Sequence, residues 1–305
     1  MAGVILTSSH PKALWPGVKA WFGRMYDTHQ TEYTDLFDTT TSEKQYEEFV
    51  QVTPFQMAPE KPQGRPVEYT SEVQGPVTRA THVLYALGYI VSYEEIKNDL
   101  YTQVSQTRAG SLANAFRQTK ERVGAGIYNN AFSASYTGAD GVSLCSTAHP
   151  NTSGGTYSNR LSTDASLSEA ALEDMLIMIM QATDDVGNLI NLMPRSLHVP
   201  PALWFEANRI LKSVYQTNTA NNDINVINAT NALPMGTKLN HYFTSSTAWF
   251  VRTNVQQGMY YIERESLQFD KDNDFDTMNA KAKGFEWYSF TWVDGGRAVY
   301  GSAGA

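Results

Sequence analysis

Two side chains in the sequence have the types and the spacing that nucleophilic catalysis would need. Cys145 and His149 lie four residues apart. A cysteine thiolate activated by a neighbouring imidazole is the nucleophile of cysteine hydrolases. The pair falls in a loop rich in Gly, Ser and Thr, and no cysteine-protease signature surrounds it. We therefore expect a small, half-buried cysteine and a polar loop histidine, with a hydrolase as the alternative from a different class of function.

The residues that could hold a metal or a nucleotide do not have the required spacing. The four aspartates of 270–276 alternate as in a calcium-binding loop, but the sixth position is Phe275 instead of Gly and the twelfth is Lys281 instead of Glu. The remaining histidines are scattered without zinc-ligand spacing, and neither a Walker A nor a Gly-x-Gly-x-x-Gly sequence occurs. We expect a solvated acidic turn at 270–276, and no catalytic, cofactor or metal site.

The composition excludes several further classes of protein. The 305 residues carry a net charge of −8 with 42% hydrophobic and 18% charged residues, and they include a single cysteine, so an internal disulfide is excluded. The longest strongly apolar run, Met175–Met180, is far shorter than the ~20 residues of a membrane helix. Lys and Arg do not cluster as in a dedicated nucleic-acid binder. We expect a soluble protein with no membrane segment and no signal peptide.

The N-terminal part of the chain is expected to form two extended excursions. Residues 1–42 are an irregular, aromatic-rich arm, which packs either on its own domain or on a neighbouring subunit, because large exposed aromatic side chains are unfavourable in water. Residues 43–82 predict two β-strands around the proline-rich tip 57–66, and an isolated hairpin needs a surface to lie against. The candidate intersubunit contacts are Trp15, Trp21, Phe22, Tyr26, Tyr46, Phe49, Phe55, Lys61, Arg65 and Tyr69.

Both helices and strands are expected in the rest of the chain. The apolar run 83–91 predicts a buried strand, and the capping box Ser92–Glu95 begins a helix of about 30 residues that ends near Gly124 or Gly126. A turn-rich loop follows at 133–165. Further helices are expected from Ser166 to near Gly187 and after Pro201, and strands at 196–199, 239–243, 248–252, 259–263 and 285–293. The order predicts an α+β fold without βαβ repetition.

A series of motifs in the second half of the chain is more specific. It comprises Asp140–Pro150 (DGVSLCSTAHP), Gly154–Thr156, Ser158–Asn159, Leu167–Leu172, His198–Leu203, Ala207–Leu211, Ala248–Phe250, Gly258, Arg264 and Val299–Ser302. This series resembles bacteriophage major capsid proteins of the Hong Kong 97-type fold, and within them the Mu-like major head subunit group. The resemblance covers roughly residues 85–305.

The resemblance implies an architecture as well as a fold. By order along the chain, residues 1–42 would be the N-terminal arm and residues 43–82 the extended β-hairpin loop. Residues 83–165 and 263–295 would form the peripheral domain, with the long spine helix, and residues 166–262 and 296–305 the axial domain. The subunits would assemble as hexamers and pentamers into an icosahedral head shell.

The resemblance also implies the shell's contents and partners. The shell would enclose the double-stranded DNA of a tailed phage without sequence-specific binding, and it would be assembled in the host bacterial cytoplasm. Portal and separate scaffolding proteins are the expected partners, and no enzymatic activity is implied. The alternative within this fold is an encapsulin-like compartment that encloses enzymes.

Overall fold

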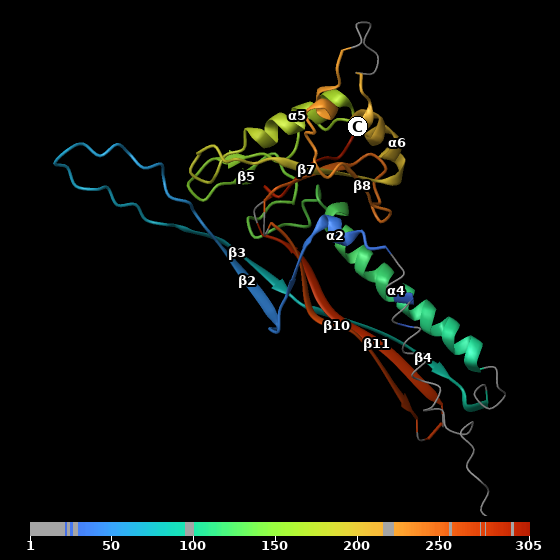
Figure 1. Ribbon diagram of the computed structural model, residues 1–305. Coiled ribbons are helices and arrows are strands. Elements are labelled where there is room, and N and C mark those ends of the chain that lie inside the picture. The colour runs from blue at the N-terminus through green and yellow to red at the C-terminus, as the bar shows by residue number, and fades with distance from the viewer. Residues whose placement is uncertain are drawn as a thin grey trace, which may run out of the picture.

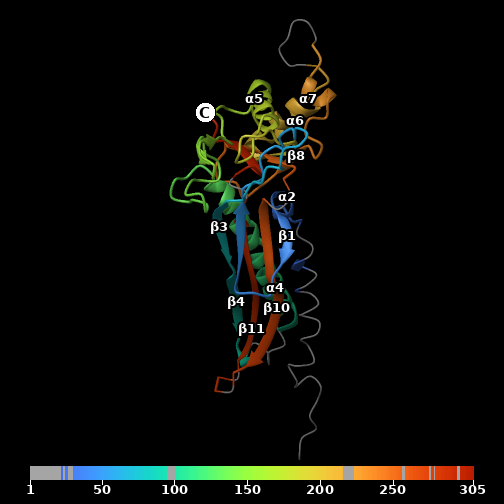
Figure 2. The ribbon, with the colours of Figure 1, turned by 90° about the vertical axis from the view of Figure 1, so that its left-hand side faces the viewer.

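The computed structural model describes most of the chain and shows an elongated molecule with two layered bodies (Figure 1). The described residues are 22, 25–26, 30–94, 101–215, 223–255, 258–274, 276–277, 279–293 and 296–305, with the backbone alone at 101–106. The lower body is built on a long, narrow sheet and the upper body on a shorter sheet (Figures 1 and 2). No helix among these residues is long and apolar enough to cross a membrane.

The lower sheet has four strands in the order β1–β10–β11–β4. They are β1 (Asp38–Thr41), β10 (Met259–Asn273), β11 (Ala280–Trp292) and β4 (Val83–Val91). β1 runs parallel to β10, and the other neighbours are antiparallel. The helix α4 (Tyr101–Asn129) lies along one face of this sheet (Figure 2). Strands from the two ends of the chain are therefore hydrogen-bonded neighbours.

The helix α4 continues past both glycines at which it was expected to end. A Cβ atom on Gly124 would lie 3.1 Å from the ring of Phe290, so this glycine permits close approach of the helix to β11 and does not terminate it. The expected end near Gly124 or Gly126 is therefore wrong, and the helix runs to Asn129. The expected beginning at Ser92 adjoins residues 95–100, which lie outside the described residues.

The upper sheet has the order β12–β9–β7–β8. Its strands are β12 (Val299–Ser302), β9 (Trp249–Thr253), β7 (Pro194–Val199) and β8 (Thr237–Leu239). β7 is parallel to β8 and antiparallel to β9. Alternation along β9 separates two cores, because Trp249 and Val251 point into one cluster and Phe250 into the other.

The helices of the upper body cover one face of its sheet. They are α5 (Glu169–Met180), the short 3₁₀ helix η3 (Pro201–Leu203) with α6 (Trp204–Lys212), and α7 (Val226–Ala229). The N-cap of α5 is Ser168, whose side chain accepts a hydrogen bond from the amide of Ala171. The expected N-terminus at Ser166 and the expected end near Gly187 are therefore both wrong for α5.

The hairpin formed by β2 (Tyr46–Val52) and β3 (Gln74–Thr81) leaves the lower sheet and carries a long loop (Figure 1). The loop 53–73 has no regular strand, so the second strand begins at Gln74 and not directly after the proline-rich tip 57–66. The arm expected to be irregular contains α2 (Tyr33–Leu36) and β1. The structure corrects that expectation, because β10 supplies the partner that makes a strand of residues 38–41.

Several strand boundaries also differ from the sequence-based ones. β10 has 15 residues where 259–263 was expected, and it continues through Asp270 and Asp272. β8 ends at Leu239, and β12 was not expected at all. β8 and β12 form by pairing with strands distant in sequence, which a local pattern does not report, whereas the extension of β10 pairs with β11, the next strand along the chain.

Candidate functional site

The structure puts Cys145 and His149 to structural uses. Cys145 is fully buried, and this burial raises the pKa of its thiol above the usual range, which keeps it in the poorly nucleophilic protonated form. The His149 ring lies 2.6 Å from Asp140 Oδ2 and 3.0 Å from Asn159 Oδ1, and it stacks on Tyr157. Neither of these ring-nitrogen contacts involves the thiol.

Asn159 is the centre of this buried polar site. Its side-chain nitrogen donates hydrogen bonds to the carbonyl oxygens of Leu144, Gly296 and Val299 at 2.6, 2.8 and 2.9 Å. Its side-chain oxygen accepts from the amide of Ser146 at 2.8 Å. The loop that carries the most specific sequence motif is thus fixed to the chain that enters β12. The sequence marks Asn159 only as part of the resemblance, because two of its partners lie near the far end of the chain.

A second buried cluster joins the arm to α4 and β11. Lys120 Nζ lies 2.7 Å from Glu286 Oε2, and both side chains are buried. Tyr26 receives a hydrogen bond from Lys120 at 2.8 Å and lies under the guanidinium of Arg117 at 4.0 Å. Burial raises the pKa of the Glu286 carboxyl, and Lys120 opposes that shift. These contacts hold the arm residue Tyr26 against its own chain.

The candidate contact residues of the arm and of the strand pair divide by exposure. Phe22 is buried and stacks on Phe269 with 4.8 Å between ring centroids, and Phe49 stacks on Tyr260 at the same separation. Tyr46 is partly exposed beside Arg79. Phe22, Tyr26 and Phe49 therefore have partners within the chain. Trp15 and Trp21 lie outside the described residues.

The remaining candidates project from the hairpin loop. Phe55 is 56% and Tyr69 95% exposed, and Lys61 and Arg65 near the tip are exposed as well. Residues 54–73 are exposed throughout. A long segment with exposed aromatic side chains cannot be stabilised by a core of its own, so it presents apolar surface for an association.

The strand β4 is a second apolar surface, and sequence reasoning missed it. The run 83–91 was expected to be buried, but β4 is an edge strand with α4 on one face only. Leu84 and Ile90, which lie on the face of the strand away from α4, are each more than half exposed. The available signal was that apolar residues occupy both faces of this strand, which indicates cover on both sides, and the residues that the structure describes provide cover on one.

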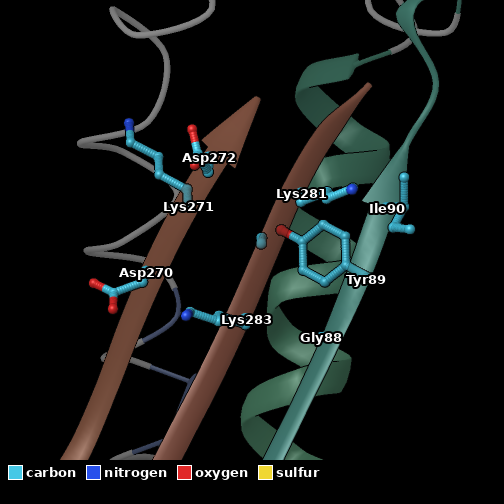
Figure 3. Close-up of a pocket in the computed structure, with 9 residues that line it drawn as sticks. Gly88, Tyr89, Ile90, Asp270, Lys271, Asp272, Lys281 and Lys283 are labelled. Atoms are coloured by element: carbon cyan, nitrogen blue, oxygen red, sulfur yellow. The ribbon is translucent and has the colours of Figure 1, made fainter. Parts of the chain in front are cut away.

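Beside β4, the lower end of the sheet is hollowed into a groove of about 600 Å³ (Figure 3). Its lining residues are Gly88, Tyr89, Ile90, Asp270, Lys271, Asp272, Lys281, Ala282 and Lys283. In the register of β10 and β11, Asp270 lies opposite Lys283 and Asp272 lies opposite Lys281. The aspartates expected in a solvated acidic turn thus begin in a strand, opposite lysines. Among the described residues, no three acidic, His or Cys side chains are arranged to hold a metal ion.

Solved capsid structures share this arrangement of elements. The capsid of cyanophage P-SCSP1u has a TM-score of 0.55 and 10% identity, covering 90% of this chain and 88% of that chain. The mature capsid of bacteriophage PhiM1 has a TM-score of 0.55 and 9% identity, and the match covers 90% of this chain and 86% of that chain. The structure of a virus-like particle from Pyrococcus furiosus has a TM-score of 0.53 and 11% sequence identity, and the match covers 93% of this chain and 97% of that chain.

These likenesses show that the chain has the Hong Kong 97-type capsid fold, the fold of a class of shell-forming structural proteins. A sequence model of the phage capsid protein family matches residues 77–301. The chain belongs to that family, and it is a shell-forming capsid protein. A comparison with the curated proteins finds no match. Its assignment to the Mu-like group stays a prediction.

Proposed function

We propose that this chain is the major capsid subunit of a tailed phage, which assembles as hexamers and pentamers into an icosahedral head around double-stranded DNA. Membership of the phage capsid family over residues 77–301 carries the proposal. The surface supports it, because the loop 53–73 and the strand β4 expose apolar side chains that the described part of the chain does not cover. Assembly takes place in the host bacterial cytoplasm.

The proposed domains follow the order of elements. Residues 1–42 are the arm and residues 43–82 the extended loop. Residues 83–165 and 263–295 form the peripheral domain around α4, and residues 166–262 and 296–305 form the axial domain. Two of the three core clusters, one in the upper and one in the lower body, support this division, and the third contains residues of both proposed domains. Within it, the exposed hairpin residues Phe55, Lys61, Arg65 and Tyr69 are the proposed contacts to neighbouring subunits.

The driving force for assembly is burial of apolar surface between subunits. A buried aromatic side chain contributes roughly 1–3 kcal/mol before the entropic cost of association. Every subunit repeats the same contacts in a closed shell, so modest individual contacts sum over the particle. The net charge of −8 fits a wall that encloses DNA without sequence-specific binding. Portal and separate scaffolding proteins are the proposed partners.

The experiment is to express the full chain, alone and with the scaffolding protein of the same phage, and to examine it by sedimentation and negative-stain microscopy. Closed particles are expected. The Phe55→Ser/Tyr69→Ser variant should remain as folded, unassembled subunits with an unchanged melting temperature, because both side chains are exposed in the subunit. Tyr69→Phe, the matched control, keeps the apolar ring and should assemble.

Normal particles from the double serine variant would refute the role of the loop, and soluble wild-type monomers under both conditions would refute the function. Particles that enclose an enzyme in place of DNA would favour the encapsulin-like alternative. The arm is tested by deleting residues 1–21. Deleting 1–42 would also remove Leu36 and Phe37 from the core, so the subunit itself would be destabilised.

A further inference from the structure

The hairpin contacts both the lower sheet and the upper body of the subunit. Midway along β2, Phe49 stacks on Tyr260 of β10, and His82, which follows β3, is hydrogen-bonded to Ser289 of β11. Near the outer end of β2, the side chain of Gln51 reaches the upper body, where its Nε2 donates a hydrogen bond to Asp185 Oδ2 at 3.0 Å. The Phe49 and His82 contacts join the hairpin to the lower sheet, and the Gln51 contact joins it to the upper body.

Asp185 is held rigidly where it meets the hairpin. It is only 4% exposed, and its other carboxylate oxygen accepts a hydrogen bond from Arg297 at 2.8 Å. Arg297 is itself fixed through a hydrogen bond to the carbonyl of Thr183. The turn that carries Asp185 is closed by Asp184, whose side chain accepts from the amides of Val186 and Asn188. One carboxylate therefore serves both the fixed arginine and the hairpin.

The opposite strand approaches the same region closely. A Cβ atom on Gly75 would lie 2.9 Å from Thr152 Oγ1 and 3.3 Å from the carbonyl of Gln51, so the absence of a side chain lets β3 lie against the loop after β5 (His149–Pro150). Ser153 of that loop donates a hydrogen bond to the carbonyl of Asp185. The outer end of the hairpin is thus seated on two adjoining loops of the upper body.

The contact between Gln51 and Asp185 lies at the outer end of the strand pair, where it restricts the direction of the hairpin. Gln51 is the last residue but one of β2, and residues 54–73 beyond it are exposed. The loop reaches well past the rest of the molecule (Figure 1). A contact at the outer end of a strand pair restricts its direction more than a contact at the base, because a small rotation at the base displaces the far end most.

We propose that Asp185 is a positioning residue that fixes, through Gln51, the direction in which the extended loop leaves the subunit. The consequence for shell geometry rests on the proposed function. The contact itself is a property of the single subunit. Loss of the Gln51 side chain removes this hydrogen bond and leaves both the packing of Gly75 against Thr152 and the Asp185–Arg297 pair in place, so the direction of the loop is less restricted without loss of the fold.

The test measures the direction of the hairpin in the unassembled full chain. Spin labels are placed at Val73→Cys, beside the outer end of the hairpin, and at Phe205→Cys on α6; both positions are exposed, and the native cysteine is buried. A single narrow distance distribution is expected in the parent. Gln51→Ala should broaden or split it, and Gln51→Glu, which faces Asp185 with a like charge, should broaden it further.

Gln56→Ala is the matched control, because Gln56 is an exposed glutamine in the same excursion. It should leave the distance distribution unchanged, and all three glutamine variants should keep the parent's melting temperature. A distribution in Gln51→Ala as narrow as that of the parent would overturn the proposal.

The second readout is the particle. Under conditions in which the wild-type chain forms intact shells, Gln51→Ala should yield fewer particles or misshapen ones. Normal wild-type yield and shape in that variant would overturn the consequence for assembly. Wild-type protein that forms no shell would contradict the proposed function, and the distance measurement would still decide the role of Asp185.

Discussion

His198 on β7 should make the folded subunit less stable as the solution is acidified. Its side chain is buried and its Nε2 lies 2.8 Å from Ser196 Oγ. Burial, and to a smaller extent the positive charges of Arg252, Lys238 and Arg195, lower the pKa of His198 to about 3. The imidazole is therefore neutral in the folded subunit throughout the range in which an unfolded histidine becomes charged.

The sign and size of the effect follow from proton linkage. An unfolded histidine binds its proton near pH ~6.5, so between that value and pH 3 the unfolded chain holds a proton that folded His198 does not. The contribution of His198 to stability is fully present above the unfolded pKa and is lost as the pH falls toward the folded pKa. The slope is ~1.4 kcal/mol per pH unit, so going from pH 7.5 to pH 5.0 removes about 2 kcal/mol.

The assay is urea unfolding of unassembled subunits, followed by tryptophan fluorescence between pH 5.0 and 7.5. Other groups titrate in this range, so the informative quantity is the difference between the parent and His198→Gln. That difference in the free energy of unfolding should change by about 2 kcal/mol across the range. Ser196→Ala is the control, because it keeps the buried histidine and should keep the parent's slope. Parallel curves for the parent and His198→Gln would refute the reasoning.

Three further predictions concern stability. Gly284→Ala places a methyl group 2.7 Å from a buried phenylalanine ring and should lower the free energy of unfolding by ~1–3 kcal/mol, whereas Gly126→Ala, in open space within α4, should raise it by ~0.5–1 kcal/mol; urea titration measures both. Lys120→Met leaves the Glu286 carboxylate buried without its cation and should cost ~3–5 kcal/mol in the same titration. The aspartates of Asp270–Asp276 lack the calcium-loop pattern, so a chelator should leave the melting temperature unchanged in calorimetry.

Each of these predictions has a result that contradicts it. Equal stability of the two alanine variants would show that β11 can move away from α4 at no cost. If Lys120→Met/Glu286→Gln did not recover most of the loss, then lost packing and not the unpaired carboxylate would be the cause. A large fall in melting temperature on addition of a chelator would show that a cation is bound and would contradict the prediction.

The helices of the upper body were predictable because their signals are local. The apolar residues Leu172, Met175 and Ile179 recur at three- and four-residue spacing, and all three are buried in α5. Pro201 leads into α6 through a 3₁₀ turn, as a proline preset for a first helical turn does. Packing moved the boundaries of these elements but left their type unchanged.

The buried polar sites could not be predicted, because their members are distant in sequence. Lys120 and Glu286 lie in different halves of the chain and become a pair only because α4 lies on β11. The contacts from Asn159 to Gly296 and Val299 depend in the same way on the placement of β12. Spacing along the chain carries no information on such pairs.

The sequence by itself determined the class of fold, the motif series that marks a phage capsid protein, and the presence of an extended hairpin segment with a proline-rich tip. These properties are local, because composition, periodicity and short motifs belong to contiguous residues. Only the tertiary structure decided that β4 is an edge strand with an open apolar face, that Phe22 and Tyr26 pack within the chain, and that Gln51 meets Asp185. Burial and hydrogen bonding depend on which distant segments meet, and that is decided only when the chain packs.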